Sequence, residues 1–158
     1  ARGFSSLCMS KALKDSGING KIFTVDLLPH EKAIYWNNIT DAQKGKISRR
    51  TLLNEWRQYL DEVTFLCGKS KFILKKISIL RVNFAFLDAS HIYDDVKLES
   101  DWVIKRQFSG DVIVFDDYNE ILFPGLVRAV DEIIQSGQYF TNIIQGYDGR
   151  SYVIATRI

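Results

Sequence analysis

The sequence has few of the residues that would place it in a special class of protein. There are only two cysteines, Cys8 and Cys67, among 158 residues. They are too few and too far apart for the disulfide framework of a secreted domain. We therefore expect two reduced thiols in the core of a cytoplasmic protein. No apolar run reaches the roughly 18 residues that a membrane-spanning helix needs, so a membrane partner is not expected.

An excess of charge of one sign is also missing. The 21 basic residues are nearly balanced by 19 acidic ones, which gives a formal net charge of +2. Such a balance argues against a dedicated nucleic-acid-binding protein, although a local basic patch is compatible with it. Hydrophobic residues make up 46% of the chain, which is typical of a globular protein. We expect one domain, residues 1–158, with a core of its own.

Two apolar runs end abruptly in acidic residues. Residues 84–87 are followed by Asp88, and residues 112–115 are followed by Asp116 and Asp117. If both runs are parallel strands, these carboxylates meet at the sheet edge where ligands bind. Crowded carboxylates repel one another, and hard cations prefer oxygen ligands, so we predict a divalent metal there. The alternative is structural, with Asp88 capping the following helix and Asp117 capping a turn.

Helical and strand patterns alternate along the chain. We predict strands at 22–25, 63–67, 84–87 and 112–115. We predict one helix capped by Ser5 or Ser6, one capped by Ser48, helices at 72–79 and 93–107, and a helix from Pro124 with an apolar stripe. Strand-like runs at 139–147 and 151–158 flank Asp148-Gly149, which is a hairpin signal. The fold class is therefore α/β: a mostly parallel sheet with helices on both faces and a C-terminal antiparallel hairpin.

Other polar residues follow predicted strands. Asp26 could accept hydrogen bonds from ribose hydroxyls, or it could simply cap a loop. The segment 68–70 could border a flat ring, or it could be an ordinary turn. His91 lies three residues beyond Asp88 and could act as a general base, or it could be a hydrogen-bonded loop histidine. We expect the second histidine, His30, at the surface.

These motifs carry a family resemblance. The segments LDASHIYDDV at 87–96, VIVFDDY at 112–118 and FPGLVRAVDE at 123–132 resemble the class I S-adenosylmethionine-dependent methyltransferases. Within them, the chain is similar to the metal-dependent O-methyltransferase-like group that includes macrocin O-methyltransferase and cephalosporin hydroxylase-type proteins. The resemblance covers nearly the whole chain and implies a Rossmann-like methyltransferase sheet.

The resemblance also implies the roles of particular residues. Asp26 would bind the ribose of S-adenosylmethionine, and Ser70 would contact its adenine. Asp88, Asp116 and Asp117 would hold Mg²⁺ or Mn²⁺. The full set of cofactor-binding residues implied is Gly3, Phe4, Ser5, Asp26, Leu27, Gly68, Ser70 and Asp88.

The chain departs from the family pattern in two places. The family has a second carboxylate where this chain has Ser90, which leaves His91 as the candidate catalytic base. The first strand of the family and the start of its glycine-rich loop have no counterpart before Gly3. We therefore expect the domain to be N-terminally incomplete, with further residues upstream in the parent protein.

The function that this resemblance implies is transfer of a methyl group from S-adenosylmethionine to a hydroxyl of a small molecule. Sugar, polyketide and phenolic hydroxyls all fit as the acceptor. Tyr35 and Trp36 are candidate walls of the acceptor pocket. A homo-oligomer is compatible with the sequence. Ser90 motivates an alternative, a non-catalytic cofactor-binding or interaction protein on the same fold. A phosphate-handling receiver-like domain and a metal-dependent hydroxylase or lyase are further alternatives.

Overall fold

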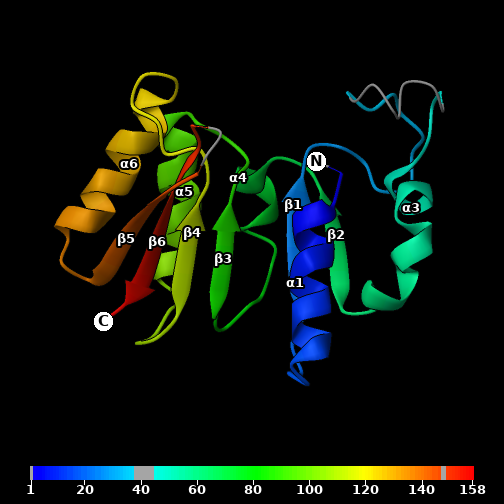
Figure 1. The fold of residues 1–158 in the computed structure, drawn as a ribbon, viewed down its shortest axis with the longest axis horizontal. Helices are drawn as coiled ribbons and strands as arrows, with labels where there is room; N and C mark the ends of the chain where they lie inside the picture. Colours follow the sequence, from blue (N-terminus) through cyan, green and yellow to red (C-terminus); the bar gives the residue numbers. More distant parts are fainter. Residues whose placement is uncertain (1, 38–44, 147–148) are drawn as a thin grey trace. The chain divides into compact units, whose positions relative to one another are not determined.

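The computed structural model describes residues 2–37, 45–146 and 149–158. The chain divides into two compact units, Ala1–Ile73 and Leu74–Ile158, called here the N-terminal and C-terminal units. Figure 1 shows helices and strands alternating along both. Among the described residues, no helix combines the length and apolar character needed to cross a bilayer.

The N-terminal unit contains a pair of parallel strands. Strand β1 (Ile22–Asp26) pairs with β2 (Val63–Cys67) so that Asp26 lies opposite Cys67. Helix α1 (Phe4–Asp15) begins after its N-cap Gly3, which has a positive φ of 89°. The predicted cap at Ser5 or Ser6 is therefore wrong, since both residues already lie inside the helix. The short helix α4 (Ser70–Ile73) follows β2.

The α-helix that follows Ser48 is only four residues long. The Ser48 side chain caps α3 (Arg49–Leu52) by accepting a hydrogen bond from the Thr51 backbone, as predicted. The chain then tightens into the 3₁₀ helix η1 (Asn54–Tyr59), in which Trp56 departs from helical geometry. Because 3₁₀ hydrogen bonds span three residues, this segment winds more tightly than an α-helix.

The C-terminal unit is a four-stranded mixed sheet with two long helices. The strand order is β3-β4-β6-β5, in which β3 and β4 are parallel and the other pairs are antiparallel. Figure 1 shows α5 and α6 lying beside this sheet. The bounds are β3 (Phe84–Leu87), α5 (Tyr93–Ile104), β4 (Val112–Phe115), α6 (Pro124–Gln135), β5 (Tyr139–Gln145) and β6 (Ser151–Arg157).

The core of the C-terminal unit lies where both helices pack on the sheet. Ile113 and Phe115 of β4 are completely buried, and Val96 of α5 is 2% exposed. Helix α6 presents the predicted apolar stripe, with Val130 fully buried. The stripe also includes Leu126, Val127 and Ile133, which belong to the same cluster. This packing holds the carboxyl ends of β3 and β4 in a fixed position.

The predicted helix at 72–79 is largely absent, because α4 ends at Ile73. Backbone carbonyls beyond that point are taken by side chains of the α5 region instead. Trp102 Nε1 donates to the Leu74 carbonyl at 2.9 Å, and Arg106 Nε donates to the Ile79 carbonyl at 3.1 Å. The first of these contacts occupies a carbonyl that a helix over 72–79 would use in its own hydrogen bonding.

The predicted C-terminal hairpin is present as β5 and β6, paired from Tyr139↔Arg157 to Gln145↔Ser151. Gly149 has a φ of 78°, as expected for the glycine of such a turn, while Asp148 lies outside the described residues. Both cysteines are free, but they are exposed, so the prediction of core thiols is wrong.

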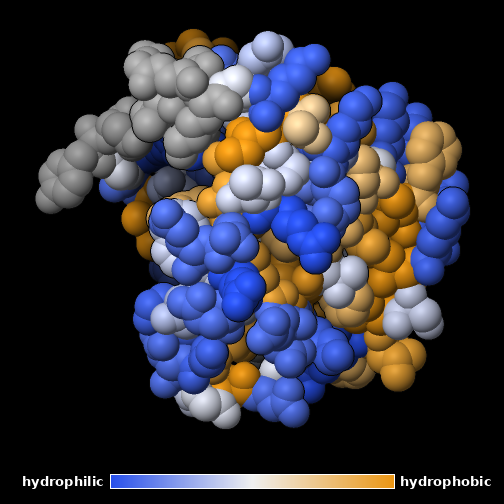
Figure 2. All heavy atoms as spheres, turned by 90° about the vertical axis from the view of Figure 1, so that its right-hand side faces the viewer, coloured by the Kyte–Doolittle hydropathy of each residue, from blue (hydrophilic) through white to orange (hydrophobic). Residues whose placement is uncertain are grey.

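Hydrophobic residues also reach the surface between hydrophilic ones on the face that Figure 2 shows.

Candidate active site

The ends of β3 and β4 bring the predicted acidic residues to one edge of the C-terminal sheet. Leu87 pairs with Phe115, and the Asp116 backbone N–H donates to the Leu87 carbonyl at 3.1 Å. Asp88 and Asp116 therefore follow neighbouring parallel strands at the same level. This is the position from which side chains of an α/β sheet reach a ligand.

Three side chains converge at this edge. Ligand atoms of Asp88, His91 and Asp117 all lie within 4.8 Å of one another. We call these three residues the strand-end cluster. Asp116 is not part of this group: it is only 6% exposed, and its Oδ1 accepts the Asp117 backbone N–H at 2.7 Å. The structure thus brings Asp88 and Asp117 together as expected and adds a histidine nitrogen.

The backbone at Asp117 has an unusual conformation. Its φ is +56°, and it is the one residue other than glycine with a positive φ among residues 2–37, 45–146 and 149–158. The neighbouring Tyr118 N–H donates to the Ser151 carbonyl at 2.8 Å, which anchors the chain directly after the turn. A left-handed residue other than glycine is costly and is found most often where a side chain must point in a particular direction.

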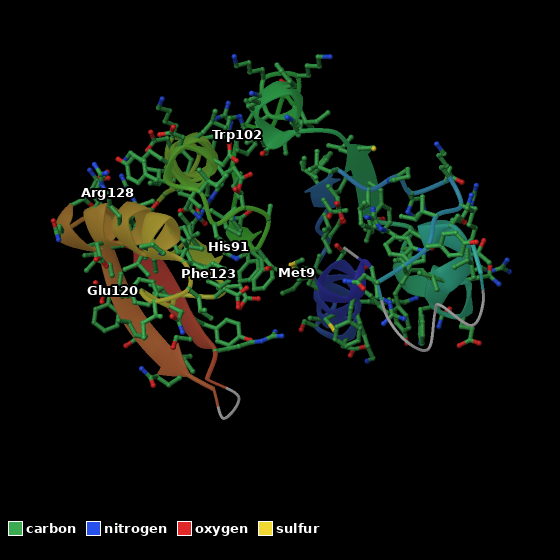
Figure 3. The ribbon with its side chains drawn as sticks, turned by 90° about the horizontal axis from the view of Figure 1, so that it is seen from above. Met9, His91, Trp102, Glu120, Phe123 and Arg128 are labelled. Carbon is green, nitrogen blue, oxygen red and sulfur yellow. The ribbon has the colours of Figure 1, made fainter. Side chains whose placement is uncertain are left out.

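His91 is held by a ring contact rather than by hydrogen bonds at its Nε2 atom. Its imidazole stacks on Phe123 with a centroid distance of 3.9 Å and an interplanar angle of 19°. Figure 3 shows the two rings lying together. Nε2 is buried and lies 3.3 Å from Asp117 Oδ2, but it makes no hydrogen bond within the described part of the chain. The geometry between these two atoms is outside hydrogen-bonding angles, so this nitrogen lacks a proper partner there.

Glycine at position 125 allows the histidine loop to pack against the start of α6. A Cβ placed on Gly125 would lie 2.9 Å from both the His91 carbonyl oxygen and the Tyr93 nitrogen. Both are backbone atoms, which cannot swing aside as a side chain can. The loop that carries Asp88 and His91 is therefore fixed by close backbone contact as well as by the Phe123 ring.

Two of the carboxylates at this edge, Asp88 and Asp116, have pKa values raised above the usual range. Burial raises the pKa of Asp88, and repulsion from Asp116 and then Asp117 raises it further, while His91 opposes this. Burial also raises the pKa of Asp116, as does the charge of Asp117, although the backbone hydrogen bond from Asp117 acts in the other direction. Such a group of mutually repelling acids is stabilised by a cation or a proton.

Ser90 is not part of the strand-end cluster. Its hydroxyl donates to Asp95 Oδ2 at 3.0 Å and accepts from the Ile92 backbone N–H at 3.3 Å. It therefore organises the first turn of α5. The N-cap of α5 is Ile92, without a side-chain cap, so the alternative in which Asp88 caps this helix is wrong.

In the N-terminal unit, the predicted cofactor residues lie around the ends of β1 and β2. The Gly68 N–H donates to the Asp26 carbonyl at 2.8 Å, which places these two residues side by side. Gly68 has a φ of 149°, and Gly3 lies close enough to the interior that an added Cβ would be 2.9 Å from Leu53 Cδ1. Ser70 begins α4, whereas Phe4 and Leu27 are 73% and 63% exposed.

The carboxylate of Asp26 is held by the protein on both oxygens. Oδ1 accepts the Leu28 backbone N–H at 2.9 Å, and Oδ2 lies 2.6 Å from Arg49 Nη2. Sequence reasoning missed Arg49, because nothing in the local pattern connects two residues that are 23 positions apart. It missed the role of Phe123 for the same reason.

Two further expectations for this unit are wrong. His30 is not a surface residue: its side chain is 19% exposed, and its ring stacks on Phe65 at a centroid distance of 4.0 Å. Trp36 is 4% exposed and donates through Nε1 to the Ile47 carbonyl at 2.8 Å. It belongs to the interior and is not available as a pocket wall, unlike the exposed Tyr35.

Comparison with known proteins now identifies the family. Residues 1–118 match a family model described as a methyltransferase domain. The chain belongs to this methyltransferase family. No curated protein sequence shows significant similarity to the methyltransferase. The resemblance to the class I S-adenosylmethionine-dependent methyltransferases is confirmed at the level of family and fold.

Solved structures share the fold of this methyltransferase. An O-methyltransferase from Bacillus cereus in complex with S-adenosylhomocysteine superimposes with a TM-score of 0.69 at 16% identity, covering 99% of this chain and 70% of the other. The O-methyltransferase NovP gives 0.69 at 20% identity, with 99% and 69% coverage. TomG from Streptomyces achromogenes, in complex with S-adenosylmethionine, gives 0.66 at 17%, with 98% and 68%. The predicted Rossmann-like fold is thereby confirmed.

Proposed function

We propose that this methyltransferase transfers the sulfonium methyl group of S-adenosylmethionine to a hydroxyl oxygen of a small molecule, with a divalent cation bound beside the reacting oxygen. The observation that carries the proposal is the strand-end cluster, in which donor atoms of Asp88, His91 and Asp117 lie within 4.8 Å of one another. Two solved structures of the same fold are O-methyltransferases with S-adenosylmethionine or its product bound.

The donor set of the strand-end cluster fits a divalent cation. Carboxylate oxygens are the ligands that Mg²⁺ and Mn²⁺ prefer, and the pKa of Asp88, raised by burial and by its acidic neighbours, indicates a deficit of positive charge. Asp88 and Asp117 would bind the ion directly, with Asp116 as the third carboxylate of the site. When bound, Mg²⁺ or Mn²⁺ supplies positive charge that favours loss of the acceptor's hydroxyl proton.

The cofactor would bind at the residues that the family pattern assigns. Gly3 and the start of α1, with Phe4 and Ser5, would meet the methionine part. Asp26 and Leu27 would meet the ribose. The remaining contacts within the N-terminal unit would come from Gly68 and Ser70. Support comes from the backbone: Gly3 and Gly68 both adopt positive φ values, 89° and 149°, that let the main chain approach a ligand closely.

In the proposed reaction the acceptor oxygen forms a bond to the methyl carbon while the carbon–sulfur bond breaks. The products are a methyl ether and S-adenosylhomocysteine. The hydroxyl proton passes to His91 Nε2, which lacks a hydrogen bond within the described residues and faces Asp117. Stacking on Phe123 fixes the imidazole plane, so the base keeps its orientation before the acceptor arrives. The chain otherwise acts by aligning oxygen, carbon and sulfur.

A non-catalytic cofactor-binding protein is the second candidate, and Ser90 favours it. The hydroxyl of Ser90 is engaged by Asp95 and cannot replace the carboxylate that the family has at this position. In that case the protein would bind S-adenosylmethionine but would neither bind the cation nor transfer the methyl group.

Calorimetric titration separates the two candidates. We expect the protein to bind S-adenosylhomocysteine, and to bind Mg²⁺ with an affinity that falls at least about tenfold in Asp88→Asn and in Asp117→Asn, since each removes a charged ligand. The matched control is Asp94→Asn, the same change in the first turn of α5. Binding of S-adenosylhomocysteine without Mg²⁺ would support the second candidate, and binding of neither would refute both. Transfer of labelled methyl to sugar, phenolic or polyketide hydroxyls identifies the acceptor.

A further inference from the structure

Arg49 is a charged side chain in the interior of the N-terminal unit. The residue is 2% exposed and is the first residue of α3, directly after the cap Ser48. Its guanidinium carbon lies 5.6 Å from the ring centroid of Trp36 and 5.6 Å from that of Phe65. Burial works to lower the pKa of Arg49, and the neighbouring Asp26 opposes this. Burying a guanidinium is costly unless its charge is paired with an opposite charge.

The Arg49 side chain lies close to two predicted cofactor residues, Asp26 and Gly3. Nη2 lies 2.6 Å from Asp26 Oδ2. The aliphatic stem lies beneath Gly3, because a Cβ added to Gly3 would be 3.5 Å from Arg49 Cδ. One buried side chain therefore supports both the acid at the end of β1 and the glycine that precedes α1.

The Asp26 carboxylate is bound by groups of the protein but remains partly exposed to solvent. Its side chain is 22% exposed, compared with 3% for Arg49. Arg49 contacts Oδ2, and the Leu28 N–H contacts Oδ1 at 2.9 Å. Charge-assisted contacts of this kind fix the rotamer of a carboxylate.

We propose that Arg49 is a positioning residue for the cofactor. It holds the Asp26 side chain in one orientation, so that the carboxylate accepts hydrogen bonds from the two ribose hydroxyls of an adenosine-containing ligand. The inference rests on the proposed use of S-adenosylmethionine. The competing explanation is that the pair only stabilises the fold of the N-terminal unit, in which case its loss would not depend on the ribose.

The test compares two ligands by calorimetry: S-adenosylhomocysteine and the analogue that lacks both ribose hydroxyls. For the unchanged protein we expect the analogue to bind about 10- to 100-fold more weakly, the size expected for hydrogen bonds to a charged group. In Arg49→Met this ratio falls below about threefold, because the carboxylate is no longer fixed. The affinity for the analogue itself stays within about threefold.

Two further variants keep the test decisive. Arg49→Lys retains the charge but loses the planar fork, and we expect an intermediate ratio even if the methionine variant does not fold. Arg50→Met is the matched control: Arg50 is the next residue, its side chain is 72% exposed, and it pairs with Glu31 at the surface. It should leave the ratio unchanged.

The outcomes distinguish this inference from the function on which it rests. If the unchanged protein does not bind S-adenosylhomocysteine, both are overturned. If it does, but Arg49→Lys and any folded Arg49→Met protein keep the full ribose preference, only the role of Arg49 is overturned. An equal loss of affinity for both ligands would likewise assign the ion pair to the fold alone.

Discussion

Replacing Gly125 with alanine tests how the histidine loop is held. The added methyl group would lie 2.9 Å from the His91 carbonyl oxygen and 2.9 Å from the Tyr93 nitrogen, both backbone atoms. Ordinary contacts begin near 3.4 Å, so the start of α6 and the loop must move apart by about half an ångström.

The expected cost follows from this overlap. Overpacking of this kind costs about 1–3 kcal/mol, and the better helix propensity of alanine returns up to about 1 kcal/mol. We therefore expect Gly125→Ala to lower the free energy of unfolding by about 1–2 kcal/mol in urea. The matched control is Gly20→Ala, whose added methyl would meet only the Leu13 side chain, at 3.2 Å. That side chain can rotate, so a change within about 0.5 kcal/mol is expected.

The same variant should disturb His91 specifically. The chain has two histidines, so their ring protons can be resolved by NMR. In the unchanged protein Phe123 should shift the His91 ring protons through its ring current, since the two rings are 3.9 Å apart. Gly125→Ala should reduce that shift and leave His30 unaffected. Unchanged stability together with an unchanged His91 signal would refute the close packing of this loop.

Three other predictions concern the same unit. Burial and the hydrogen bond to Asp131 raise the pKa of Tyr118 to about 12. The stability that this pair contributes is therefore present below pH 10 and is lost as the pH rises through 12. Ultraviolet titration should show this ionisation, and Asp131→Asn should lower the pH at which it occurs. Burial acts to raise the pKa of Asp111, but hydrogen bonds led by Arg81 outweigh it and lower the pKa. Because Arg81 is half-exposed and its charge is screened by solvent, Asp111→Asn should cost about 1–2 kcal/mol at pH 7. This difference should shrink as falling pH protonates the carboxyl, and an undiminished difference in acid would contradict the prediction. Asp117→Gly should keep stability within about 1 kcal/mol because glycine tolerates a positive φ, whereas Asp117→Ala should be less stable; equal losses in urea would count against strain at Asp117.

The strand ends were predictable because parallel pairing leaves little freedom. Once residues 84–87 and 112–115 are paired parallel strands, Asp88 must lie near the acidic pair Asp116 and Asp117. The placement of Asp116 was not predictable. Whether Asp116 or Asp117 points towards Asp88 depends on the left-handed turn at Asp117, and an aspartate in that conformation has no reliable sequence signal.

Contacts between distant residues account for most of what the sequence could not show. The position of His91 depends on Phe123, 32 residues later, and the end of α4 depends on Trp102 and Arg106 taking backbone carbonyls. Local propensity describes only which secondary structure a segment favours in isolation, without its tertiary contacts. The exposed cysteines have the same cause, since their burial depends on which helix face or strand end meets a partner.

The most direct test of the strand-end cluster is a titration with Mn²⁺ followed by electron paramagnetic resonance, in which free Mn²⁺ gives the signal. We predict that the unchanged protein removes one equivalent of Mn²⁺ from the free pool, and that Asp117→Asn loses this site while Asp94→Asn retains it. Retention of the site in Asp117→Asn, or no uptake by the unchanged protein, would contradict a cation site formed by the ends of β3 and β4.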